Sequence, residues 1–202
     1  ENSFTIESGA EAEYSLTLAD GAYAVTCDGG SYRAKAAIVA TGSTLRHLGI
    51  PGEEQFDGRG VSHCATCDGP FYMRQTVGVV GGGDSAADEA LTLTEYADRV
   101  FLFHRRDQLR AQRVLQERLV RHPKIEIFWN TEVQAILGEE SVSAVRGHNV
   151  VTNLDTVVDL LGLFVYVGLD PNSQFTSRIL KLDNAGHILV NLQMETNIPG
   201  IF

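Results

Sequence analysis

The sequence is poor in cysteine and in positive charge, and it contains no long apolar run. Three cysteines in 202 residues are too few and too unevenly placed for the disulfide framework of a secreted protein, which favours a reducing, cytoplasmic location. No run of about 18 apolar residues occurs, so we expect a soluble chain without a membrane partner. The formal net charge of −10 argues against general nucleic-acid binding, which needs a basic surface.

The rest of the composition is typical of a globular protein. Hydrophobic residues make up 44% and charged residues 21% of the chain, which is enough apolar material for a sizeable core in one or two small domains. The sequence starts at Glu1 rather than at a methionine and stops at Phe202, directly after "TNIPGI". We therefore expect it to be a fragment, or the ordered part, of a longer protein.

The first third of the chain is dominated by turns and short apolar runs. Residues 1–43 alternate apolar runs with Asp-Gly and Gly-Gly turns, which predicts hairpins that lead into a buried strand at Ala37–Ala40. The segment Gly49–Gly60 is dense in glycine and charge, and we expect a linker or domain boundary there.

Strand and helix patterns alternate from Thr76 onward. The sequence predicts a buried strand from Thr76, a helix from near Asp84 and a second strand at Val100–Phe103, which together form a βαβ unit. A helix over Gln108–Arg121 and a strand at Ile125–Trp129 follow. This alternation predicts a parallel sheet and an α/β fold. Short strands return after residue 131, with a hairpin over 150–158 and a buried run over 160–167.

The stretch "GGGDSA" at residues 81–86 fits the pattern G-x-G-x-x-A. Gly81, Gly83 and Ala86 occupy the positions that allow a tight turn, close approach of a pyrophosphate, and close packing of the helix on the strand. The stretch lies between a predicted strand and a helix N-terminus, whose free N–H groups and dipole favour phosphate. We interpret it as a dinucleotide site; the alternative is a glycine-rich turn that binds no ligand.

The end of the next predicted strand carries positive rather than negative charge. At this position an acidic residue binds the ribose 2′-hydroxyl of NAD, whereas arginine accommodates the 2′-phosphate of NADP. The sequence reads His104-Arg105-Arg106, and Arg110 follows one helical turn later. Guanidinium groups bind phosphate in a bidentate manner, so this arrangement predicts NADPH, with Asp107 as the one opposing charge. The alternative is a solvated basic face, because further arginines continue along the following helix.

Two of the three cysteines form a C-x-x-C pair in "HCATCDGPFY". A zinc site would need two more ligands at suitable spacing, and neither Cys27 nor the six histidines provide them, so we predict no metal. Buried free cysteines are a second alternative, although the neighbouring Asp-Gly-Pro favours a turn rather than a core. The spacing also allows Cys64 and Cys67 to close a small ring as a redox pair, which is our interpretation. Asp68 would then serve as the general acid, provided that burial raises its pKa.

Five motifs together resemble the low-molecular-weight, bacterial-type thioredoxin reductases. They are "CATCDG", "VGVVGGGDSAADEA", "HRRDQLRAQ", "GLFVYVGLDPN" and "TNIPGIF", and they occur in the order and spacing of that family over essentially the whole chain. The resemblance implies a homodimeric flavoenzyme that carries electrons from NADPH through FAD to the Cys64–Cys67 disulfide and on to thioredoxin or a thioredoxin-like protein. It also implies a Rossmann-like NADPH domain of three layers, residues 48–160, inserted into a second, FAD-type Rossmann-like domain formed by 1–47 and 161–202.

The resemblance also assigns roles to individual residues. Cys64, Cys67 and Asp68 correspond to the catalytic group. The residues that correspond to the family's cofactor contacts are Gly81, Gly82, Gly83, Asp84, Ser85 and Ala86 at the pyrophosphate, His104, Arg105, Arg106 and Arg110 at the 2′-phosphate, and Thr41 and Gly42 on the flavin side.

The sequence departs from the family's pattern in the flavin-binding parts. The family's first G-x-G-x-x-G for FAD and its final Ala-Gly-Asp segment have no counterpart within these 202 residues. We therefore keep a non-catalytic NADPH-binding module as an alternative function. A reductase of a peroxiredoxin system is another, although Ala65-Thr66 between the cysteines, rather than Pro-His, favours thioredoxin.

Overall fold

A computed structural model describes residues 15–19, 22–27 and 30–202, and these form two compact units. Unit 1 consists of Glu1–Leu45 and Leu169–Phe202, and unit 2 consists of Arg46–Gly168. Unit 2 is thus an insertion between two segments of unit 1. Its two ends meet, because the Arg46 N–H donates to the Gly168 carbonyl at 3.0 Å. In the described part of the chain, no helix has the length and apolar character needed to cross a membrane.

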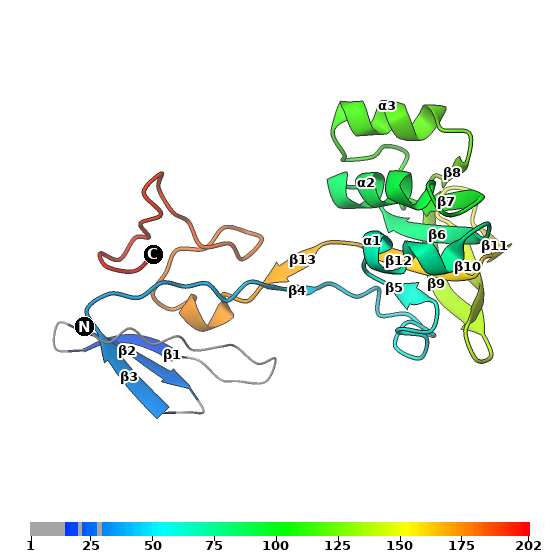
Figure 1. The fold of residues 1–202 in the computed structure, drawn as a ribbon. Helices are drawn as coiled ribbons and strands as arrows, with labels where there is room; N and C mark the ends of the chain where they lie inside the picture. Colours follow the sequence, from blue (N-terminus) through cyan, green and yellow to red (C-terminus); the bar gives the residue numbers. More distant parts are fainter. Residues whose placement is uncertain (1–14, 20–21, 28–29) are drawn as a thin grey trace. The chain divides into compact units, whose positions relative to one another are not determined.

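Unit 2 is built on a five-stranded parallel sheet (Figure 1). The strands, in spatial order, are β5 (Val61–Ser62), β12 (Gly162–Tyr166), β6 (Thr76–Gly81), β7 (Arg99–Phe103) and β8 (Ile125–Phe128). The three central strands, β12, β6 and β7, are short, largely apolar and mostly buried, as parallel strands usually are, whereas the edge strand β8 is only partly buried. The parallel sheet confirms the predicted α/β class, and the predicted order of strand, helix and strand from Thr76 is correct.

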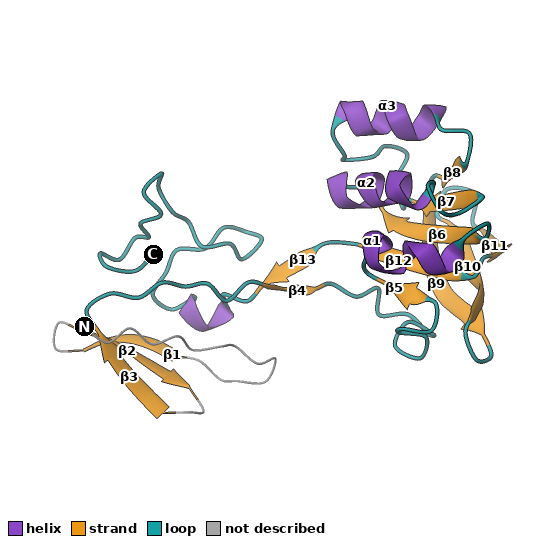
Figure 2. Cartoon of the chain, in the orientation of Figure 1, coloured by secondary structure: helices purple, strands orange, loops and turns teal. Residues whose placement is uncertain are grey.

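Helices and a second sheet cover the two faces of the parallel sheet (Figure 2). The helical layer contains α1 (Ala65–Asp68), the 3₁₀ turn η1 (Gly69–Tyr72), α2 (Asp84–Leu93) and α3 (Arg113–Arg121). The opposite layer is an antiparallel sheet in the order β11 (Leu154–Asp159), β10 (Val142–Asn149) and β9 (Thr131–Gly138). Because alternate strand residues point to opposite faces, one apolar core forms on each side of the parallel sheet. Three layers result.

The second helix begins five residues later than the sequence predicts. Residues 108–112 are not helical, and α3 starts at Arg113. The N–H groups of Arg110 and Ala111 instead donate to the carbonyl of Gly82, at 2.7 and 3.0 Å. The buried side chains of Leu109 and Ala111 anchor the same segment in the core. Arg110 therefore lies on a loop tied to the glycine turn, and not one helical turn beyond Arg106.

The segment Gly49–Gly60 is a packed part of unit 2 and not a linker. The carboxylate of Glu53 is buried and accepts the N–H groups of Leu48 and Gly49, at 2.9 and 2.7 Å. Phe56 is only 2% exposed, in the core beneath the antiparallel sheet. Glycine is required here because neighbouring atoms approach the backbone closely. A Cβ on Gly52, for example, would lie 2.3 Å from the carbonyl oxygen of Ile136. Glycine content signals tight packing here rather than flexibility.

Unit 1 contains short antiparallel elements. Its described strands are β1 (Ser15–Ala19), β2 (Ala22–Cys27) and β3 (Gly30–Ala34), which form a meander, and β4 (Ser43–Leu45), which pairs with β13 (Leu169–Pro171); η2 (Gln174–Thr176) is a 3₁₀ turn. The expected meander is present, but the expected buried strand at Ala37–Ala40 is not. Ile38 is 80% exposed, and Ala37 makes only an isolated parallel bridge with Ile201.

The end of unit 2 lies further along the chain than the sequence analysis places it. Residues 161–168 were expected to belong with 169–202. β12 is instead hydrogen-bonded between β5 and β6 in the parallel sheet, so this stretch is part of unit 2. Which cofactor each unit binds stays a prediction.

Replacing Gly52 by alanine tests the packing of the 49–60 segment. The added Cβ would collide with the Ile136 backbone, and the φ of +91° is unfavourable for a residue with a side chain. We expect Gly52→Ala to lower the free energy of unfolding by about 3 kcal/mol or more, measured by denaturant titration. Gly58→Ala is the matched control, because Gly58 has φ +67° and no atom within 4 Å of its Cβ position. It should cost only about 1–2 kcal/mol, and equal losses would contradict the packing argument.

Candidate functional site

The cysteine pair closes a disulfide at the start of α1. The Cα atoms of Cys64 and Cys67 are 5.3 Å apart and their sulfurs are bonded. Cys64 is the N-cap of the helix, with an extended backbone, and its Sγ accepts the Cys67 N–H at 3.2 Å. Cys64 is half-buried and Cys67 is exposed. The pair is therefore joined, and one of its sulfurs lies at the surface of unit 2.

Asp68 is held beside the disulfide by Ser62. The Ser62 hydroxyl donates to Asp68 Oδ2 at 2.6 Å and accepts the Cys64 N–H at 3.1 Å. The serine is buried, with 5% of its surface exposed, and the aspartate is half-buried. One hydroxyl thus fixes both the backbone of the first cysteine and the carboxylate predicted to be the acid. Ser62 is not among the residues predicted from the sequence, although its position two residues before Cys64 was a usable signal.

Two tyrosines lie behind the redox turn. The Tyr166 hydroxyl accepts the Ala65 N–H at 2.9 Å, and the ring of Tyr72 packs edge-on against Phe164. Burial raises the pKa of Tyr166 well above its usual value, and the charge of Glu89 raises it further. Burial, and then the charge of Asp68, also raises the pKa of Tyr72. Both phenols therefore stay protonated at neutral pH.

The glycine turn joins β6 to α2 as the sequence predicts. A Cβ on Gly81 would lie 2.5 Å from the Tyr166 carbonyl oxygen and 2.6 Å from the Ala86 Cβ, so this glycine allows close packing of helix and strand. A Cβ on Gly82 would lie 2.2 Å from the His104 ring. A Cβ on Gly83 would meet no protein atom within 4 Å. The fold itself does not need a glycine at residue 83, which fits a position left open for close approach of a ligand.

His104 ties the glycine turn to the arginine loop. Its side chain is buried, and its two ring nitrogens lie 2.8 Å from the Gly81 carbonyl oxygen and 2.9 Å from that of Gln108. Asp84 adds a second tie, because its carboxylate accepts the backbone N–H of Gln112 at 2.6 Å and the Gln112 side-chain amide at 3.1 Å. These two residues, predicted to contact the cofactor, thus position the loop that carries the arginines.

A cavity of about 620 Å³ lies in unit 2 over the carboxyl ends of β6 and β7. Among the residues that line it are six of those predicted for the cofactor site: Gly81, Gly82, His104, Arg105, Arg106 and Arg110. The three arginines are exposed, and within the described residues their guanidinium groups have no hydrogen bond or ion pair. The cavity therefore offers a polar turn beside unpaired positive charge, which is the chemistry that a phosphorylated dinucleotide requires.

The other predicted cofactor residues, Gly83 and Asp84 among them, are not part of this cavity's wall. Ser85 is exposed on the first turn of α2, whereas Ala86 is buried in the core. Thr41 and Gly42 belong to unit 1, where the Thr41 hydroxyl donates to the Asn172 carbonyl at 2.7 Å and the Gly42 carbonyl accepts the Asn172 N–H at 3.0 Å.

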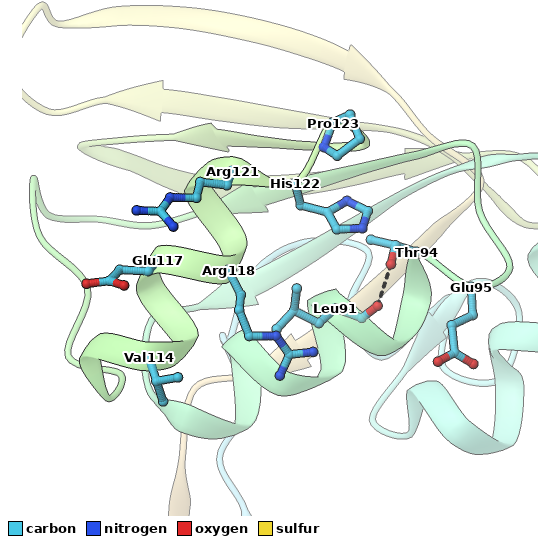
Figure 3. Close-up of a pocket in the computed structure, with 9 residues that line it drawn as sticks. All are labelled: Leu91, Thr94, Glu95, Val114, Glu117, Arg118, Arg121, His122 and Pro123. Carbon is cyan, nitrogen blue, oxygen red and sulfur yellow. Dashed lines mark hydrogen bonds between the residues drawn. The ribbon is translucent and has the colours of Figure 1, made fainter.

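A second cavity, of about 490 Å³, lies between α2 and α3 and contains none of the predicted site residues (Figure 3). It is bordered by Leu91 on α2, by Thr94 at the C-cap of that helix, and by Arg118 and Arg121 on α3. Over the described ranges, no group of three or more His, Cys, Asp or Glu side chains could hold a metal ion.

The three glycines of the turn differ in what an added methyl group would meet. Gly82→Ala should push the His104 ring away from its two carbonyl partners and lower the free energy of unfolding by about 1–3 kcal/mol. Gly83→Ala should cost less than about 1 kcal/mol, because its Cβ position is open. Thermal or urea unfolding of the two variants measures the difference. A larger loss at residue 83 than at residue 82 would contradict this description of the turn.

Comparison with known proteins agrees with this geometry. The family model described as pyridine nucleotide-disulphide oxidoreductase matches residues 5–202. A thioredoxin reductase of Listeria innocua is 44% identical over 179 residues, which are 88% of this chain and 56% of that protein. One of Treponema pallidum is 43% identical over 183 residues, which are 91% of this chain and 59% of that protein.

The fold also resembles known structures of related proteins. Lactococcus lactis thioredoxin reductase in its FR conformation superimposes with a TM-score of 0.83 at 40% identity, covering 95% of this chain and 64% of that one. The chain thus spans little more than half the length of the curated relatives that it matches. The resemblance drawn from the five motifs is confirmed: the chain belongs to the pyridine nucleotide-disulphide oxidoreductase family, and within it is similar to the low-molecular-weight thioredoxin reductases.

Proposed function

We propose that this chain provides the NADPH site and the redox-active disulfide of an NADPH-dependent disulfide reductase that acts on thioredoxin or a thioredoxin-like protein. The observation that carries the proposal is the presence, in one compact unit, of the Cys64–Cys67 disulfide and of a cavity lined by a glycine turn and three exposed arginines. The relatives named thioredoxin reductase support the choice of acceptor. The cytoplasmic location and the homodimer stay predictions.

The nucleotide site favours NADPH over NADH. The pyrophosphate would lie against the open Gly83 and the N-terminus of α2, where backbone N–H groups attract anions. Arg105, Arg106 and Arg110 would bind the 2′-phosphate through charge-assisted hydrogen bonds. Asp107, the acidic residue next to these arginines in sequence, is not part of the cavity wall, and Glu132 is the one acidic residue that lines it. When bound, NADPH supplies the hydride from which the reducing electrons come.

FAD enters the proposal through the family resemblance alone. The two residues predicted on the flavin side, Thr41 and Gly42, both bond to Asn172. These contacts by themselves do not form a cradle for a flavin, and we derive no step through FAD.

The residues of the redox turn can carry out disulfide exchange. Two electrons and two protons convert the Cys64–Cys67 disulfide to a dithiol. One thiolate then attacks the disulfide of the acceptor and forms a mixed disulfide, and the second cysteine displaces the reduced acceptor and restores the Cys64–Cys67 bond. Asp68, 2.6 Å from the Ser62 hydroxyl and next to Cys67 in sequence, is placed to hold the proton that a departing thiolate needs.

Removing the arginines tests the nucleotide assignment. The Arg105→Ala/Arg106→Ala double variant should weaken NADPH binding by roughly 10- to 100-fold, the value of one or two lost charge-assisted hydrogen bonds, because the 2′-phosphate loses its partners. Binding of NADH, which has no 2′-phosphate, should change by less than about threefold. Isothermal titration calorimetry of both nucleotides measures the ratio.

Arg118→Ala is the control for this experiment. Arg118 is an exposed arginine of the same basic run, but it borders the cavity between α2 and α3 rather than the proposed nucleotide site. This variant should leave both affinities unchanged. Equal weakening of NADPH and NADH by the double variant would count against the 2′-phosphate role.

Replacing Cys67 by serine tests the redox assignment. With NADPH, added FAD and a disulfide dye or thioredoxin as acceptor, Cys67→Ser should abolish turnover while NADPH affinity stays as in the unmodified chain, because residue 67 does not line the nucleotide cavity. Retained turnover in this variant would refute the redox role. An unmodified chain that binds NADPH but shows no turnover would identify a module that only binds the nucleotide.

A further inference from the structure

The antiparallel sheet of unit 2 ends in an edge strand that is exposed along almost its whole length. β11 pairs with β10 on one side and, among the described strands, has no neighbour on the other (Figure 1). Of its six residues only Val158 is buried. An edge of this kind offers a row of unpaired N–H and C=O groups to another extended chain.

The register of β11 on β10 shows which backbone groups point toward this free edge. The two strands pair without a shift, and the Leu160 N–H donates to the Ser143 carbonyl at 3.2 Å. Opposed residues of an antiparallel pair alternate between hydrogen-bonded and non-hydrogen-bonded positions, so residues 158, 156 and 154 also bond to β10. The N–H and C=O groups of Asp155, Val157 and Asp159 therefore point outward.

Large apolar side chains are concentrated along the same edge. Single exposed apolar residues are common on protein surfaces, whereas a group of them marks a site of interaction. Within residues 150–161, five such side chains expose between 46% and 73% of their surface: Val150, Val151, Leu154, Val157 and Leu161. No function proposed above uses them.

The sheet that carries this edge is acidic. Residues 131–159 contain five acidic residues and one arginine. Because alternate residues of a strand share a face, Asp155 and Asp159 lie on either side of Val157 on the outer face of β11. The Asp155 carboxylate bonds to His148 at 2.7 Å, whereas the Asp159 side chain has no hydrogen bond or ion pair in the described part of the chain. An added strand meets a carboxylate, a valine and a second carboxylate in turn.

These charges exclude a second copy of the strand as the occupant. Antiparallel self-pairing centred on Val157 would put Asp155 of each copy opposite Asp159 of the other, and like charges that face each other across a strand pair are destabilising. The net charge of −10 on each chain adds to this repulsion. A partner of opposite charge meets no such barrier, so the two carboxylates select between partners.

We propose that the free edge of β11 is a docking site for an extended segment of another protein, in which basic residues alternate with apolar or small polar ones. The segment adds a fourth strand to the antiparallel sheet. Its backbone bonds to the outward N–H and C=O groups, its apolar side chains pack against Leu154 and Val157, and its basic groups pair with Asp155 and Asp159. The site is separate from the proposed chemistry, because no residue of β11 lines the nucleotide cavity.

The test measures the binding of two synthetic peptides to the whole chain by fluorescence anisotropy. The first, Ser-Lys-Thr-Val-Thr-Lys-Ser with blocked ends and a dye, sets its lysines opposite Asp159 and Asp155 and its valine opposite Val157. The second has glutamate in place of both lysines. The lysine peptide should bind roughly tenfold more tightly or better, and added salt should weaken it. It should also slow hydrogen exchange at the amides of residues 155, 157 and 159.

Two variants change the edge without removing a hydrogen bond to β10. Val157→Pro removes an N–H that points outward, which edge strands tolerate, and it should weaken the lysine peptide by about tenfold. Asp159→Lys should weaken the lysine peptide and strengthen the glutamate peptide. Asp88→Lys is the matched control, since Asp88 is exposed on α2, in the layer on the other face of the parallel sheet. It should change neither affinity by more than about twofold.

Four results would overturn the inference. The first is that the lysine peptide does not bind, or binds no better than the glutamate peptide. The second is an unchanged affinity for the lysine peptide in Asp159→Lys, which decides the question even where Val157→Pro does not fold. An equal loss in Asp88→Lys would reduce the effect to general attraction by an acidic chain. A dimer of the unmodified chain in sedimentation that Val157→Pro abolishes would identify a second copy as the occupant.

Discussion

The placement of β12 between β5 and β6 is the constraint on which the site depends. This strand comes from residues 162–166, about 80 residues beyond β6, yet its hydrogen bonds set Tyr166 opposite Gly81 and Phe164 opposite Ser62. Because all three strands are parallel, their carboxyl ends meet at one edge of the sheet, where ligands of such folds bind. The glycine turn, the redox turn and the tyrosine that contacts both are brought together by this pairing.

Local charge and overall charge have separate roles in this chain. The net charge of −10 argues against binding of general polyanions, whereas the loop after β7 presents at one cavity three arginines that have no partner among the described residues. That loop is not shaped by the arginines. The buried His104, the carboxylate of Asp84 and the N–H groups that bond to Gly82 determine its path. The position of the three arginines at the cavity therefore depends on contacts of the turn and of Asp84 rather than on the guanidinium groups themselves.

Features encoded within short windows were predictable from the sequence. The strand before Gly81, the helix from Asp84 and the spacing of Cys64 and Cys67 all follow from local periodicity and turn chemistry, and the structure contains each of them. The start of α3 was predicted wrongly, because Arg110 and its neighbours bond to Gly82, nearly 30 residues away.

The remaining misses share this long-range cause. Gly52 and Gly60 indicate flexibility when read alone, and only the contacts with β9 and β10 show that they serve close packing. The contact between Tyr166 and Ala65 joins residues 101 positions apart and has no local signature. The same holds for Glu89, which periodicity places on a helix without showing which neighbour its carboxylate meets.

The hydrogen bond between Arg46 and Gly168 gives unit 2 adjoining ends. A segment whose first and last residues touch can be inserted into a loop of a host chain, or removed from it, while the path of the host on either side stays almost unchanged. In terms of protein evolution, unit 2 has the geometry of a domain that can move from one protein to another as a single piece. The cavity at the glycine turn and the disulfide both lie between those ends in the sequence, so a single insertion event carries the two together.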